Sequence, residues 1–201
     1  MKKVEATTKA NGAIFIVDEM ITGFRFGLRG AQEIYGLKPD LSTYGKGIAN
    51  GYSLAVLAGR KDLMELGGLF HKKERVFLIS TTHGAETIAL AAGVAALNLM
   101  KRKKVADRLW KIGGNLKSGL NNLIKKHKLE DSVFVIGFNP HLSMLFKDKK
   151  GEVSLVLKTI FLQEVIKRNV MFQGYFAPSY SHTEKEVRKT LEVMDKAFSV
   201  Y

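Results

Sequence analysis

A short apolar run that ends in two acidic residues constrains the fold of this chain most strongly. Residues 13–17 are apolar and β-branched in part, and Asp18 and Glu19 follow directly. Such a run is typical of a strand buried in a parallel sheet, with functional residues at its carboxyl end. Similar runs at residues 54–58 and 76–79 alternate with an apolar helical stretch at 84–100, which we expect to be buried. This alternation predicts a doubly wound α/β sheet.

The second hundred residues have a different pattern, typical of a small α+β domain. The expected elements are an amphipathic helix at 109–123, two antiparallel strands at 133–137 and 142–146 joined by a turn at Asn139-Pro140, and a helix at 155–168. Thr183 and Glu186 form a capping-box pattern that opens a last amphipathic helix. We therefore expect two domains, residues 1–102 and 103–201.

Composition excludes several kinds of protein. Cysteine is absent from the 201 residues, which excludes disulfides and cysteine-ligated metals and fits a reducing compartment. The sequence has no signal-peptide pattern, and its longest apolar run is shorter than the roughly 20 residues that span a bilayer. The net charge of +13 leaves a nucleic-acid-binding surface as an alternative, but the lysines form scattered clusters without interleaved aromatics. We expect a cytoplasmic protein that binds neither nucleic acid nor membrane.

Three local groups of residues carry candidate chemistry: Asp18-Glu19, Gly45-Lys46-Gly47 and Thr81-Thr82-His83-Gly84. Each alone is ambiguous, because acids cap helices and lysines in turns are usually solvated. Together they have a chemical logic. A lysine in a tight glycine turn can approach a ligand closely, and a buried amine becomes a nucleophile for carbonyls. An acid at the end of a neighbouring strand can keep a heterocyclic nitrogen protonated, as an electron-sink cofactor requires.

Several segments carry a resemblance to a known family. The stretch from Ile16 to Arg25 resembles the D-E-V-x-T-G-F-R block of class III aminotransferases, which are fold-type I enzymes dependent on pyridoxal 5'-phosphate (PLP). The segments that follow resemble glutamate-1-semialdehyde aminomutases: Gly30-Ala31-Gln32, Tyr35-Gly36, Pro39-Asp40-Leu41 and Gly45-Lys46. Residues 80–84 match the G-T-x-x-G-N-P segment only in part, and residues 177–184 resemble the family's C-terminal end.

The resemblance implies a role for four residues. It implies that Lys46 forms a Schiff base with PLP, that Asp18 pairs with the pyridine nitrogen, and that Met20 packs against the ring in place of the usual valine. It also implies that Thr81 reaches the PLP phosphate in the neighbouring subunit of a homodimer. The implied fold is the C-terminal part of a PLP-transferase large domain, mostly parallel sheet with helices, followed by a small α+β C-terminal domain.

The resemblance covers only the C-terminal half of the family, because residues 1–12 contain no phosphate-binding loop. Three functions therefore remain open. The first is transamination of an amino acid or an amino sugar or aldehyde substrate through Lys46, and the second is glutamate-1-semialdehyde 2,1-aminomutase activity. The third is a truncated, non-catalytic half that needs an upstream partner chain with the phosphate-binding loop.

Other polar residues have weaker functional interpretations. Arg25 could orient a carboxylate, or form a surface ion pair. Glu19 could brace the cofactor pocket or make a buried hydrogen bond, and His83 could contact phosphate or cap a helix. The remaining histidines are too scattered to form a metal site, so we expect no metal.

Overall fold

The computed structural model describes residues 1–68, 72, 74, 84 and 86–200, and it divides the chain into two compact units, Met1–Ala106 and Asp107–Tyr201. The expected strand at 76–79 lies outside the described residues. The elements of the first unit are α1 (Lys2–Ala10), β1 (Ile16–Asp18), α2 (Ala31–Ile34), β2 (Leu41–Tyr44), η1 (Lys46–Ile48), β3 (Val56–Gly59), α3 (Lys61–Met64), η2 (Glu65–Gly67) and α4 (Thr87–Arg102).

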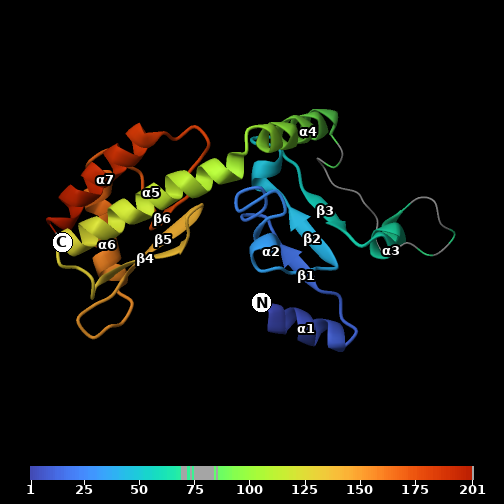
Figure 1. The fold of residues 1–201 in the computed structure, drawn as a ribbon, viewed down its shortest axis with the longest axis horizontal. Helices are drawn as coiled ribbons and strands as arrows, with labels where there is room; N and C mark the ends of the chain where they lie inside the picture. Colours follow the sequence, from blue (N-terminus) through green and yellow to red (C-terminus); the bar gives the residue numbers. More distant parts are fainter. Residues whose placement is uncertain (69–71, 73, 75–83, 85, 201) are drawn as a thin grey trace. The chain divides into compact units, whose positions relative to one another are not determined.

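A three-stranded sheet with the order β1-β2-β3 forms the centre of the first unit (Figure 1). β1 is parallel to β2, as expected, but β3 is antiparallel to β2. The interpretation of residues 54–58 as one more parallel strand was therefore wrong. The connection from β2 to β3 covers residues 45–55, and a parallel crossover takes a dozen or more residues, usually with a helix.

Two elements that we expected to be buried are largely exposed. Ile16 in β1 is 53% exposed, and Ile88 and Val94 in α4 are 66% and 62% exposed. α4 buries only Ala89 and Gly93. An apolar strand or helix becomes buried only where another layer covers it, and none of the described residues covers these faces.

The second unit is the α+β arrangement that the sequence predicted. α5 (Val105–Lys126) leads into it, followed by β4 (Val133–Phe138), β5 (His141–Phe146), α6 (Leu155–Ile166), β6 (Tyr175–Phe176) and α7 (Glu184–Phe198). β4 and β5 form the expected antiparallel hairpin, and β6 adds a third, antiparallel strand that the sequence did not indicate. The capping box at Thr183 and Glu186 is confirmed.

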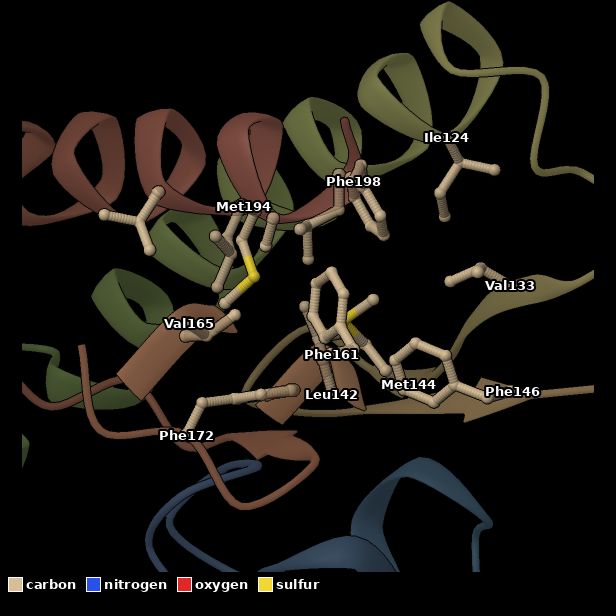
Figure 2. Packing of buried hydrophobic residues seen from close by; sticks show 14 of the residues in the cluster. Ile124, Val133, Leu142, Met144, Phe146, Phe161, Val165, Phe172, Met194 and Phe198 are labelled. Carbon is tan, nitrogen blue, oxygen red and sulfur yellow. The ribbon is translucent and has the colours of Figure 1, made fainter. Parts of the chain in front are cut away.

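Aromatic and aliphatic side chains from both helices and strands fill the core of the second unit (Figure 2). Phe161 of α6 is fully buried, and its ring centroid lies 4.8 Å from that of Phe198 and 5.2 Å from that of Phe146. α5 and α7 approach closely at Gly119, where a Cβ atom would lie 2.4 Å from Leu191 Cδ1. None of the helices in the described part of the chain has the length and hydropathy needed to cross a membrane.

Candidate active site

Strand pairing brings Asp18 and the turn of Lys46 to one edge of the sheet. β1 ends at Asp18, which is paired with Thr43 of β2. β2 ends at Tyr44, and Lys46 opens the 3-10 turn η1 two residues later. Because β1 and β2 are parallel, their carboxyl ends lie together (Figure 1). In open α/β sheets, ligands bind outside such carboxyl ends.

The carboxylate of Asp18 is held in place by one of its two oxygens. Thr43 Oγ1 donates a hydrogen bond of 3.1 Å to Asp18 Oδ1, and the Met20 N–H donates one of 2.9 Å to the same atom. Asp18 is exposed, and no hydrogen bond recorded among the described residues goes to its Oδ2. The second oxygen can therefore accept a hydrogen bond from a ligand.

Lys46 lies in a turn with an unusual backbone conformation. Its φ of 48° is in the left-handed region, which non-glycine residues adopt uncommonly and often near functional sites. The side chain is exposed, and no ion pair recorded in the described part of the chain involves it. The Lys46 amine is thus accessible to a carbonyl ligand, but the described residues do not bury it, contrary to the expectation from the sequence.

Met20 packs against the glycine that precedes Lys46. A Cβ atom added to Gly45 would lie 2.4 Å from Met20 Sδ, so only glycine allows this approach. A Cβ atom added to Gly47 would meet no atom within 4 Å beyond its chain neighbours. The expectation that both glycines remove steric bulk therefore holds for Gly45 alone.

The aspartate of the Pro39-Asp40 motif is a structural residue. Asp40 is buried, and its Oδ2 accepts a hydrogen bond of 2.8 Å from the Phe15 N–H. Its Oδ1 accepts one of 2.9 Å from Arg60 Nη1, and these two hydrogen bonds lower the pKa of Asp40. Asp40 therefore fixes the start of β1 against β2 and the end of β3. Nothing in the sequence pointed to Arg60 as its partner.

Glu19 is a buried carboxylate that organises the turn after β1. It is 1% exposed and accepts hydrogen bonds from the N–H groups of Ala31 and Gln32 at the start of α2, at 2.8 and 2.7 Å. Gln32 Nε2 in turn donates a hydrogen bond of 2.7 Å to the hydroxyl of Tyr44. Gln32 and Tyr44 were not among the expected functional residues, although Gln32 belongs to the Gly30-Ala31-Gln32 motif.

The three remaining candidates have different outcomes. Thr81 and His83 lie outside the described residues. Arg25 lies in the turn after β1 and is partly buried, and this burial lowers the pKa of its guanidinium.

Comparisons with known proteins agree with the fold and the motifs. The chain is 32% identical to the glutamate-1-semialdehyde 2,1-aminomutase of Methanococcoides burtonii, over 96% of this chain and 46% of the relative. It is 31% identical to the enzyme of the same name from Archaeoglobus fulgidus, over 98% of this chain and 48% of that relative. The chain therefore spans about half the length of the curated relatives it matches.

Solved structures share the fold at lower identity. A Bacillus anthracis aminotransferase superposes with a TM-score of 0.87 at 21% identity, covering 100% of this chain and 48% of that one. A transaminase with PLP bound superposes with a TM-score of 0.86 at 19% identity, covering 99% and 47%. The model of the class-III aminotransferase family matches residues 1–198. This chain belongs to the class-III aminotransferase family, whose cofactor is pyridoxal 5'-phosphate.

Proposed function

We propose that this chain supplies Lys46 and Asp18 to the active site of a PLP-dependent transaminase or aminomutase. One observation carries the proposal: parallel pairing of β1 and β2 brings Asp18 and the turn of Lys46 to the same edge of the sheet. An exposed amine and an anchored carboxylate at such an edge fit the two functional ends of PLP. Met20 packs against Gly45, which directly precedes Lys46.

PLP supplies an aldehyde carbon that condenses with amines and a pyridine ring that withdraws electrons. Lys46 Nζ would hold the cofactor through that aldehyde and, once released by an incoming amine, would move a proton to or from the substrate carbon. Asp18 Oδ2 would accept a hydrogen bond from the ring nitrogen and keep it protonated. Thr81 is proposed to contact the cofactor phosphate of a neighbouring subunit.

The test of this proposal is chemical trapping at Lys46. The chain, alone and together with the upstream half of a class III aminotransferase, is incubated with PLP, reduced with borohydride and digested for peptide mass analysis. We expect the added mass on Lys46 and its loss in Lys46→Ala, with Lys111→Ala as the exposed-lysine control. An unmodified Lys46 in the assembled protein would contradict the proposal.

A second candidate reaction is glutamate-1-semialdehyde 2,1-aminomutase activity. The two curated relatives named above, 32% and 31% identical, carry this name. Absorption spectra recorded with glutamate 1-semialdehyde and with a panel of amino acids distinguish the two reactions. A spectral change with amino acids but not with the semialdehyde would favour transamination of another amino donor.

We further propose that an upstream half-enzyme polypeptide completes the site. The exposed apolar residues Ile16, Ile88 and Val94 are the kind of surface that marks a protein interface, and the chain spans only about half of its relatives. The first unit would then be part of the cofactor-binding domain and the second the small C-terminal domain. A chain that traps PLP only beside this partner would be non-catalytic alone.

The assembled protein is proposed to be a cytoplasmic homodimer. The expected shared phosphate contact through Thr81 requires two subunits, and a chain without cysteine is suited to a reducing compartment. Sedimentation of the assembled protein, with and without PLP, would test the dimer. Fractionation of cells that express the protein would test its location.

A further inference from the structure

A buried carboxylate ties the first turn of α2 to the end of β1. Glu19 Oε2 accepts from the Ala31 N–H, Oε1 accepts from the Gln32 N–H, and Thr22 Oγ1 donates to Oε2 as well. Gly30 has a φ of 76°, and a Cβ atom there would lie 2.2 Å from Glu19 Oε2. The start of α2 is therefore fixed against the residue that follows Asp18.

The same helix contacts the end of β2 through a side-chain hydrogen bond. Gln32 is buried, and its Nε2 lies 2.7 Å from the Tyr44 hydroxyl. The Tyr44 ring lies against Gly23, where a Cβ atom would be 2.7 Å from Tyr44 Cδ1, and its centroid is 5.3 Å from that of Phe24. Both the ring and the hydroxyl of Tyr44 are thus held by the segment that follows β1.

We infer that Gln32 and Tyr44 are positioning residues that hold the Lys46 turn at a fixed place relative to Asp18. Glu19 follows Asp18 directly, and Tyr44 lies two residues before Lys46. The path from Glu19 through α2 and Gln32 to Tyr44 joins the two strand ends independently of the β1–β2 backbone pairing. The inference rests on the proposed function, because it concerns the approach of the Lys46 amine to the cofactor.

The Gln32–Tyr44 hydrogen bond would contribute by keeping the Lys46 amine at the correct distance from the cofactor. A misplacement of about 1 Å can slow a reaction between bound groups by roughly 100-fold. Tyr44→Phe keeps the packed ring and removes only the hydroxyl, and Gln32→Met keeps the length of the side chain and removes the donor. We expect each variant to slow borohydride-trapped modification of Lys46 by about 10-fold, as a displacement smaller than 1 Å would.

The two variants act on one hydrogen bond, so their effects should not add. The double variant Tyr44→Phe/Gln32→Met is expected to match either single variant. Tyr175→Phe is the matched control, because Tyr175 also hydrogen-bonds a glutamine, Gln173, at 3.3 Å in the second unit. It should trap PLP at the wild-type rate.

Two readouts separate positioning from a general loss of stability. Hydrogen exchange of peptides that cover residues 45–48 should accelerate about 10-fold in Tyr44→Phe without PLP, while peptides from β3 stay unchanged. With PLP, the pH at which the absorbance of the linked cofactor changes should shift in the same variant. Wild-type exchange at 45–48 and a wild-type trapping rate, with a lowered melting temperature, would overturn the inference.

The experiment also distinguishes this inference from the proposed function. If assembled wild-type protein fails to trap PLP at Lys46, the proposed function is wrong, whereas hydrogen exchange still decides whether Tyr44 holds the turn. If wild type traps PLP and Tyr44→Phe does so equally fast with unchanged exchange, the positioning role alone is wrong.

Discussion

At the scale of single residues, the site depends on small side chains that let others approach. Gly45 leaves space for Met20, Gly23 for Tyr44 and Gly30 for Glu19. None of these contacts follows from local sequence spacing, because the partners lie 25, 21 and 11 positions apart (45 − 20, 44 − 23 and 30 − 19). The three glycines therefore contribute to the site because the absence of a side chain lets a neighbouring side chain pack against the backbone.

Gly30→Ala should destabilise the first unit more than a matched change elsewhere. The added methyl group would overlap the Glu19 carboxylate, and the backbone φ of 76° is unfavourable for alanine. We expect a loss of about 3 kcal/mol in the free energy of unfolding, measured by urea unfolding followed by circular dichroism. Gly12→Ala is the control, because its φ is 67° but an added Cβ atom would meet nothing within 4 Å; it should cost about 1 kcal/mol. Equal losses of unfolding free energy in the two variants would show that the Glu19 carboxylate moves away from the added methyl group.

At the scale of elements, the start of α7 could be predicted from local sequence. The pattern at Thr183 and Glu186 predicted a capping box, which the structure confirms. Thr183 donates hydrogen bonds from its side chain and its backbone to Glu186, and these lower the pKa of Glu186 to about 2. Such contacts lie within one turn, so local sequence suffices to predict them.

Thr183→Ala should weaken α7 in a pH-dependent way. Loss of a threonine cap costs about 1 kcal/mol at pH 7. The pKa of Glu186 is lowered from 4.5 to about 2 on folding, so its stabilising contribution is complete above pH 4.5 and is lost as the pH falls towards 2. The difference between wild type and variant in the free energy of unfolding should therefore shrink as the pH falls below 4.5.

The control for this prediction is the N-cap of α6. Ser154 Oγ accepts a hydrogen bond of 3.2 Å from the Leu157 N–H, and no hydrogen bond recorded among the described residues joins it to a carboxylate. Ser154→Ala should cost about 1 kcal/mol as well, with little change across the same pH range. A parallel pH dependence for both variants would contradict the role of the Glu186 carboxylate.

At the scale of the whole molecule, the exposed apolar surface of the first unit is its most consequential property. If an upstream polypeptide covers β1 and α4, Ile16 and Val94 should be buried in the interface with that polypeptide. Ile16→Asn and Val94→Ser should then weaken binding of that polypeptide by at least about 10-fold each, since burying such a side chain contributes about 1.5–3 kcal/mol.

These two substitutions should leave the isolated chain nearly unchanged in stability, because exposed positions contribute little to folding. Isothermal titration with the upstream half measures the affinity. Val200→Ser, at a similarly exposed apolar position in the second unit, is the control and should bind normally. Unchanged affinity in Ile16→Asn and Val94→Ser would place the interface elsewhere, and their conversion of an oligomer to a monomer would indicate self-association instead.

The sequence by itself determined the α/β and α+β halves, the hairpin at Asn139-Pro140, the cap at Thr183, and the acid and lysine that follow two neighbouring strands. These features depend on periodicity and turn chemistry, which act over a few residues. Only the tertiary structure decided the antiparallel direction of β3, the Gln32–Tyr44 contact and the exposure of β1 and α4. Those properties depend on contacts between segments that are distant in the sequence. A local sequence pattern cannot predict which distant segment pairs with or covers an element.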